Sequence, residues 1–389
     1  MVVLVASALA AGGWAARRPL GTAAGWVADR GESAAGAIEG WATRLQSIAA
    51  VVPQRELQQR TAIPGSRSVL VVVGTGPGDC AFALVAAFPE GPPTLTILPQ
   101  SLLGVVPGYG QFTLAEALSF EGPELAALTV ANELGVRIDD VLALAPGDLA
   151  RALPAQVPVD LPVALFADRG EGPVQVVGAG PQQVPPATIE VLLVTAGAGD
   201  TLEWLQRQGA AWRGVLGVAA LDAEVADRLA ALPGDPAATV ANLLLAAATA
   251  ESLELGAPPV EAAAASAPGT LALSAVAAEF VGARLGHLLL LAGERPRVEV
   301  LNGNGRIGAT RVVAEAVVRR GYRVVRTDNA DRFDYPSTLV IAQGAGAQEA
   351  AREVAGIVGA ASVYLEEADP SPLVEVSIIV GLDIPAGEA

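Results

Sequence analysis

Apolar and polar residues recur with different spacings along the chain, and each spacing predicts a different element. After residue 65, short apolar runs between glycine- and proline-rich turns predict strands at 68–76, 80–88, 94–99, 174–180 and 189–197. Stretches in which apolar residues return at helical spacing predict helices at 122–135 and 201–221. Strands that alternate with helices are typical of a layered α/β domain.

The pattern becomes shorter and more regular towards the C-terminus. An Ala-rich segment, 251–295, contains one predicted helix at 270–291. From residue 297 onward, strands and helices are predicted to form a complete small α/β domain. Its strands are expected at 297–302, 322–328, 338–343, 362–367 and 374–383, and its helices at 309–321 and 347–359.

These patterns predict three regions. Residues 1–64 are predicted as a membrane anchor and stalk, 65–295 as the layered domain with its Ala-rich connecting segment, and 296–389 as the small domain. The anchor prediction rests on an uncharged apolar run that ends at Arg17 and Arg18. This run is shorter than the ~20 residues of a membrane span and lacks a preceding basic region. We interpret it as the outer part of a signal anchor, with a buried Ala-rich helix as the alternative.

Charge and composition narrow the range of functions. The net charge is −17, which argues against nucleic acid and anionic membrane surfaces as electrostatic partners. All 24 basic residues are arginine, so a Walker A phosphate loop and lysine-based catalysis are excluded. One cysteine, Cys80, and one histidine, His287, cannot build a disulfide or an ordinary zinc site. Both lie in apolar surroundings, and we predict packing roles for them.

A glycine-rich turn follows the first strand of the small domain. It spells G-x-G-x-x-G and opens a predicted helix, with glycines at Gly303, Gly305 and Gly308. Such a loop can hold a pyrophosphate at the helix N-terminus, and Asp328 stands where a ribose would be bound. However, only one strand–helix–strand unit follows, whereas a dinucleotide domain needs two. We therefore predict a structural turn positioned by Asn302 and without a ligand; a nucleotide-binding oxidoreductase is the alternative.

The same region resembles a known family. The run VEVLNGNGRIGATRVVAEAVVRRGYRV and the closing strand that ends at Val380-Gly381-Leu382-Asp383 closely resemble the C-terminal domain of LytR-type envelope proteins. That domain opens with V-x-V-L-N-G-x-G-x-x-G and has no established chemistry. The resemblance implies a location and a set of partners more than a reaction.

The middle of the chain, roughly residues 65–290, resembles the LytR-CpsA-Psr catalytic domain, which transfers lipid-pyrophosphate-linked glycopolymers to peptidoglycan. The retained motifs are Pro107-Gly108-Tyr109-Gly110, Gly122-Pro123-Glu124-Leu125, Gly135 and Ile138-Asp139. Of the residues that the resemblance implies are functional, only Asp79 and the pair Arg207-Gln208 remain. Asp79 is better explained as a turn or cap residue than as a metal ligand, and Arg207 is also explained by a surface ion pair with Glu203 one helical turn away.

The departures from the family pattern concern the charged groups of its pocket. The family's Pro-Arg-Asp turn is Pro99-Gln100-Ser101 here, the arginine before the metal-associated aspartate is replaced by Pro77 or Gly78, and Thr195 stands near an expected Arg-x-Arg. Residues 68–136 contain no basic side chain. Forked arginine hydrogen bonds contribute about 1.5–3 kcal/mol each, so their loss from a diphosphate site predicts loss of transfer.

The leading hypothesis is a membrane-anchored envelope protein on the extracytoplasmic side of the cell membrane. Its middle domain is predicted to be degenerate, with no catalytic residue and no cofactor, and to act by binding or scaffolding. A polyprenyl-linked glycan or peptidoglycan is the expected partner. The alternative is a residual phosphotransferase that uses Asp79 and Arg207 with magnesium. Arginines turned into the same cavity would contradict the hypothesis, and the candidates are Arg137, Arg151, Arg169 and Arg213.

Overall fold

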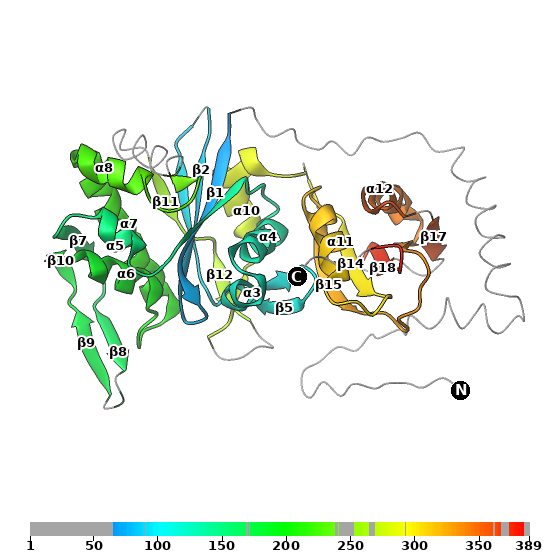
Figure 1. Ribbon diagram of the computed structural model, residues 1–389, viewed down its shortest axis with the longest axis horizontal. Coiled ribbons are helices and arrows are strands. Elements are labelled where there is room, and N and C mark those ends of the chain that lie inside the picture. Colours follow the sequence, from blue (N-terminus) through cyan, green and yellow to red (C-terminus); the bar gives the residue numbers. More distant parts are fainter. Residues whose placement is uncertain are drawn as a thin grey trace, which may run out of the picture.

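A computed structural model describes residues 65–384 except 90, 169, 171, 238, 239, 241–252, 264–268, 292, 361 and 367–372. Within these residues the chain forms two five-stranded sheets, each accompanied by helices (Figure 1). The first sheet belongs to the predicted layered domain, called the middle domain below. The second belongs to the predicted small domain, called the C-terminal domain. The predicted α/β fold class is confirmed.

The sheet of the middle domain has the strand order β11-β3-β2-β1-β6. Strands β1, β2 and β3 pair antiparallel, whereas β6 and β11 run parallel to their neighbours. The strands span Arg67–Gly76 (β1), Asp79–Ala87 (β2), Thr94–Leu98 (β3), Asp140–Leu144 (β6) and Glu254–Gly256 (β11). Strands β2 and β3 are buried along almost their entire length, because helices cover both faces of this sheet.

Helices form one layer on each side of this sheet. One face packs against α3 (Leu114–Glu121), α4 (Pro123–Leu134) and α10 (Ala277–Leu285). The other face packs against α5 (Asp148–Ala152), α6 (Pro186–Val194), α7 (Thr201–Leu221) and α8 (Ala223–Ala230). Alternate residues of each strand therefore enter two different apolar cores.

The described residues also form four two-stranded ribbons. They pair β4 with β5, β7 with β10, β8 with β9 and β12 with β13. Their strands span Leu103–Val106 (β4), Gly110–Thr113 (β5), Val157–Leu161 (β7), Leu165–Asp168 (β8), Pro173–Val177 (β9), Gly180–Val184 (β10), Val260–Ala262 (β12) and Leu271–Leu273 (β13).

The sheet of the C-terminal domain has the order β15-β14-β18-β16-β17, with β16 antiparallel to β18 and the other pairs parallel. Its strands span Arg297–Asn302 (β14), Arg323–Asn329 (β15), Leu339–Gln343 (β16), Ser362–Glu366 (β17) and Val376–Val380 (β18). Helices α11 (Ala309–Val318) and α12 (Gln348–Val358) share one apolar core with these strands. The elements predicted from residue 297 onward are confirmed.

Two predicted elements are wrong in the middle domain. The run 189–197 was expected as a strand, but its first part belongs to α6, which begins with proline at its first turn. A short, continuous apolar run has no period that separates a buried strand from a buried helix, and a proline at the start favours the helix. The predicted helix 270–291 is divided into β13, α10 and a 3₁₀ turn, Gly286–Leu288, that contains His287.

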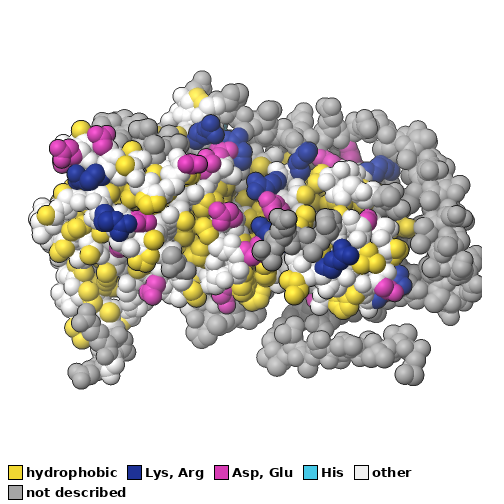
Figure 2. All heavy atoms as spheres, in the orientation of Figure 1, with side chains coloured by type: hydrophobic (Ala, Val, Ile, Leu, Met, Phe, Trp, Pro, Cys, Tyr) yellow, Lys and Arg dark blue, Asp and Glu magenta, His cyan; other side chains and the backbone are white. Residues whose placement is uncertain are grey.

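The predicted anchor and stalk, 1–64, lie outside the described residues. In the part of the chain that is described, no helix combines the length and apolar character needed to cross a membrane. On the molecular face drawn in Figure 2, acidic and basic side chains are interspersed, with no single basic patch. The predicted domain boundaries stay predictions.

Candidate functional site

Asp79 is the first residue of β2, directly after the turn that follows β1. Its side chain is exposed, and it forms no hydrogen bond or ion pair with the described residues. Within the same residues, no group of three or more His, Cys, Asp or Glu side chains is arranged to hold a metal ion. Magnesium bound by protein needs several oxygen ligands or a bound phosphate, so the residues around Asp79 do not fit a magnesium site.

Cys80, the neighbour of Asp79, points into the apolar core and is fully buried. Its thiol donates a hydrogen bond to Gln100 Oε1, with a sulfur–oxygen distance of 3.3 Å. Gln100, which the resemblance sets against the arginine of the family's Pro-Arg-Asp turn, thus accepts a hydrogen bond from a neighbouring side chain. Burial, together with the negative charge of Asp79, raises the pKa of Cys80 to about 12. The thiol is protonated at neutral pH and is not a nucleophile.

His287 is exposed and lies against the ring of Phe88, with 5.2 Å between the ring centroids. No hydrogen bond between described residues links it to Cys80. Packing therefore accounts for both side chains, although His287 packs at the surface and not on the face of a helix.

Arg207 and Gln208 lie on α7 and are each 1% exposed. Arg207 Nη2 donates to the carbonyl oxygen of Ala196, and Gln208 Nε2 donates to that of Leu193 at 2.6 Å. Trp204 Nε1 donates to the Leu193 oxygen as well, at 3.1 Å. The last carbonyls of a helix have no partner within it, and α6 ends at Val194. These α7 side chains satisfy the carbonyls at the corner between α6 and α7.

This arrangement differs from the predicted surface ion pair between Arg207 and Glu203. Arg207 is buried, and burial lowers its pKa. Among the described residues, Arg207 Nε and Gln208 Oε1 have no hydrogen-bond partner. The ion-pair interpretation failed because the neighbours Glu203, Gln206 and Gln208 are polar, and this pattern gives no sign that another part of the chain folds over Arg207.

The other arginines do not gather around Asp79. Arg137 binds Asp139 at 2.6 Å and the carbonyl oxygen of Ser66 at 2.9 Å, beside the first residues of β1. Asp79 pairs with the last residue of β1, so the ten residues of this strand separate the two sites by roughly 30 Å. Arg151 pairs with Asp148. Arg213 is exposed on α7, and Arg169 lies outside the described residues.

The glycine turn is stabilised by its own asparagines. Asn302 Oδ1 accepts hydrogen bonds from the backbone N–H groups of Asn304 at 3.2 Å and Gly305 at 2.9 Å. Asn304 Oδ1 accepts from the N–H group of Arg306 at 2.9 Å. These three loop N–H groups are therefore already engaged and are not free to hold a pyrophosphate.

Two of the glycines are required by backbone geometry and packing. A Cβ atom at Gly303 would lie 2.6 Å from Ile379 Cγ2 and 2.9 Å from the Val380 oxygen, so β18 passes too closely for a side chain. Gly308 precedes α11 with a φ of +81°, which side-chain-bearing residues rarely adopt. Close packing and turn geometry therefore explain these positions without a ligand.

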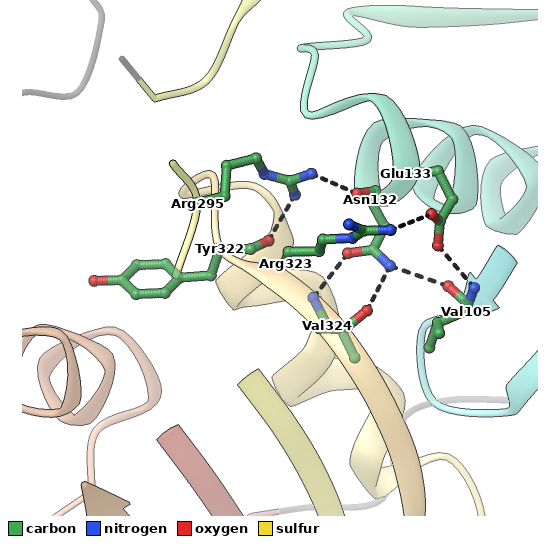
Figure 3. Close-up of polar contacts among 7 residues, drawn as sticks. All are labelled: Val105, Asn132, Glu133, Arg295, Tyr322, Arg323 and Val324. Atoms are coloured by element: carbon green, nitrogen blue, oxygen red, sulfur yellow. Dashed lines mark hydrogen bonds and ion pairs between the residues drawn. The ribbon is translucent and has the colours of Figure 1, made fainter. Parts of the chain in front are cut away.

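Sequence reasoning missed the contact between the two domains, called the domain seam below. It is centred on Asn132 of α4, whose side chain is fully buried (Figure 3). Asn132 Oδ1 accepts from the Val324 N–H at 2.9 Å, and Nδ2 donates to the carbonyl oxygens of Val324 at 2.9 Å and Val105 at 3.1 Å. One carboxamide thus connects β4 of the middle domain with β15 of the C-terminal domain. An asparagine within the otherwise apolar stretch of α4 was the available signal.

Three charged residues, Glu133, Arg295 and Arg323, also belong to the domain seam (Figure 3). Glu133 accepts from the Val105 N–H at 2.8 Å and from Arg323 Nη2 at 3.0 Å. The guanidinium of Arg295 donates to the carbonyl oxygens of Asn132 at 2.6 Å, Gly321 at 2.7 Å and Tyr322 at 2.8 Å. Burial, with the nearby positive charge of Arg323, lowers the pKa of Arg295 to about 10. Arg295 therefore remains charged at neutral pH.

The Pro-Gly-Tyr-Gly loop also belongs to the domain seam. The Gly108 N–H donates to Thr327 Oγ1 at 3.4 Å, and Thr310 Oγ1 donates to the Gly108 carbonyl oxygen at 3.2 Å. A Cβ atom at Gly108 would lie 2.7 Å from the Cα atom of Arg311 on α11. Arg311 in turn forms an ion pair with Glu121 of α3 at 2.7 Å. The loop is pressed against the C-terminal domain.

Comparison with known proteins identifies the C-terminal domain. Residues 295–383 match the family model LytR_C, described as LytR cell envelope-related transcriptional attenuator. The predicted LytR C-terminal domain is therefore confirmed. No match to the chain was found among curated proteins.

Several solved structures resemble the chain. A LytR-Csp2A-Psr enzyme from Actinomyces oris has 15% identity and a TM-score of 0.45, over 60% of this chain and 93% of that chain. TagV from B. subtilis has 14% identity and a TM-score of 0.43, over 57% and 97%. TagT bound to LI-WTA has 16% identity and a TM-score of 0.41, over 61% and 99%.

The environment of Cys80 predicts a thiol that reacts only after unfolding. At pH 8 the native chain should react with a thiol-specific disulfide reagent roughly 10-fold or more slowly than the denatured chain, because the thiol is buried and its pKa is raised. Absorbance of the released thiolate measures both rates. The chain in guanidinium is the control and should release one equivalent, since Cys80 is the only cysteine. Rapid, complete labelling of the native chain would contradict this assignment.

The domain seam predicts that Asn132→Asp lowers the free energy of unfolding by about 3 kcal/mol, because two buried carbonyl oxygens lose their donor and face a carboxylate. The matched control is Asn329→Asp, the same change at an exposed residue of β15. Denaturant titration followed by tryptophan fluorescence measures both. Equal unfolding midpoints for the two variants would show that the Asn132 side chain does not stabilise the seam.

Proposed function

We propose that this protein is a cell-envelope protein whose middle domain is a degenerate relative of LytR-CpsA-Psr glycopolymer transferases. In this proposal the chain does not transfer glycopolymers and acts by binding or scaffolding in cell-wall assembly. It is placed on the extracytoplasmic side of the membrane, held by an anchor within residues 1–64. Its partner is a polyprenyl-linked glycan or peptidoglycan.

The observation that carries this proposal is the engagement of Arg207. This is one of the few arginines that the resemblance places in the pocket, and its guanidinium is buried against the Ala196 carbonyl. A diphosphate carries at least two negative charges and is held by forked arginine hydrogen bonds. Because this guanidinium is 1% exposed, a diphosphate can reach it only if the α6–α7 corner opens.

Two further observations support the absence of transfer. Gln100 stands in the place of a motif arginine and accepts the Cys80 hydrogen bond instead of presenting a cation. Asp79 lacks the neighbouring ligands that magnesium requires. Removal of a single transition-state donor costs about 10²–10³ in rate, so the combined loss removes measurable transfer.

The domain seam supports a scaffolding role for the chain. The Pro-Gly-Tyr-Gly loop and α4, both retained from the family pattern, contact the LytR C-terminal domain directly. The apolar core of the C-terminal domain continues through this contact to Leu125 and Leu128 of α4. These motif residues thus have a structural role within the chain that requires no catalysis.

A transfer assay tests the proposal. The full-length protein is incubated with a polyprenyl-pyrophosphate-linked glycan, magnesium and peptidoglycan, beside an active LytR-CpsA-Psr transferase as the positive control. No lipid pyrophosphate or monophosphate should be released above the level without protein, because Arg207 is buried and Gln100 stands in the place of the motif arginine. Chromatography of the extracted lipids measures the products. Release that depends on this protein and is lost in Arg207→Gln would establish the residual phosphotransferase instead.

A further inference from the structure

A groove of about 640 Å³ lies between α7 and the ribbon formed by β7 and β10. It is an open groove at the surface and not an enclosed cavity. Neither Asp79 nor Arg207 lines it, and it is separate from the residues that the family pattern retains. The proposed function does not use it.

One acidic and one basic side chain line the groove. Asp160 of β7, Gln183 of β10 and Arg213 of α7 line it, and Asp160 and Arg213 are exposed. Between described residues, no hydrogen bond or ion pair involves the side chains of these three residues. The guanidinium supplies donors, the carboxylate supplies acceptors and the carboxamide supplies both. A ligand that satisfies all three must carry donors and acceptors and have little net charge.

Two other ligand classes fit less well. A peptide could add as a strand to β7 or β10, but Pro158 and Pro181 lack the N–H groups that such pairing needs. An anionic polymer would meet Asp160 and a chain with a net charge of −17. The proline rings instead offer flat apolar surface beside the polar groups, which suits a ligand whose units have both C–H faces and hydroxyl groups.

Small residues of α7 form the floor of the groove. A Cβ atom at Gly214 would lie 2.7 Å from the Pro158 oxygen, so close packing against β7 explains this glycine. A Cβ atom at Gly217 would meet nothing within 4 Å. Glycine weakens a helix interior, and packing offers no compensation at Gly217. The missing side chain leaves the groove open at this position.

We propose that the groove between α7 and the β7–β10 ribbon binds an uncharged glycan, with Arg213, Asp160 and Gln183 hydrogen-bonded to its hydroxyl and acetamido groups. The proposal rests on the proposed function, because it names the surface through which the chain binds a cell-wall polymer. The glycan strand of peptidoglycan has this chemistry, whereas a phosphate-linked polymer does not.

Calorimetric titration of the full-length protein with an N-acetylglucosamine tetrasaccharide tests the proposal. Binding should be saturable in the wild type and weakened at least about tenfold in Gly217→Leu, because the new side chain fills the groove, and in Arg213→Ala, because a charged hydrogen bond is lost. The matched control is Gly282→Leu in the interior of α10, where a Cβ atom also meets nothing within 4 Å. It should bind like the wild type, and both glycine variants should melt no lower than the wild type.

Three outcomes would overturn the proposal. They are no saturable binding to the wild type, equal affinity of Gly217→Leu and Gly282→Leu, and a glycerol-phosphate polymer that binds more tightly than the tetrasaccharide. Each of them leaves the transfer assay unchanged, so failure of the groove is distinguishable from failure of the inactive-domain proposal. Conversely, transfer activity with a functional groove would overturn only the proposed absence of catalysis.

Discussion

The C-terminal end of α4 carries carbonyl groups that the helix itself cannot satisfy, and this constraint organises the contact between the two sheets. The Asn132 carbonyl is satisfied by Arg295, and the Asn132 side chain satisfies the Val324 backbone of β15. A cation at this end also opposes the negative end of the helix dipole. Since β15 is an edge strand, its groups would otherwise need water or another strand. At this contact, each domain thus supplies hydrogen-bond partners for backbone groups of the other.

This contact gives a structural role to residues that resemble the family's motifs. The loop around Gly108 and the helix α4 both carry sequence that resembles the transferase family, yet both are engaged by the LytR C-terminal domain. Substitution of Gly108 would force the loop away from Arg311, since a side chain at this position would overlap the backbone of α11. The domain seam thus gives these residues a structural role within the chain.

The sequence predicted the elements of the C-terminal domain well, because alternation and helical periodicity are local properties with clear turns between them. It failed at 189–197, where a continuous apolar run has no period to distinguish a strand from α6. It also failed for Arg207, whose burial depends on a chain segment folding over it. The residues of the domain seam were missed because Asn132 and Val324 are 192 positions apart, and no local pattern connects them.

All basic residues of this chain are arginines, and several of them have a structural role. Arg207, Arg295 and Arg228 each donate to backbone carbonyl oxygens, and Arg137 does so beside its ion pair with Asp139. The planar guanidinium has five donors, so it can satisfy several carbonyls at the end of a helix or strand, which an ammonium group does less well. Arg207 is 1% exposed and donates to the Ala196 carbonyl oxygen, and Arg295 donates to three carbonyl oxygens. These two guanidinium groups therefore hold together the α6–α7 corner and the domain seam.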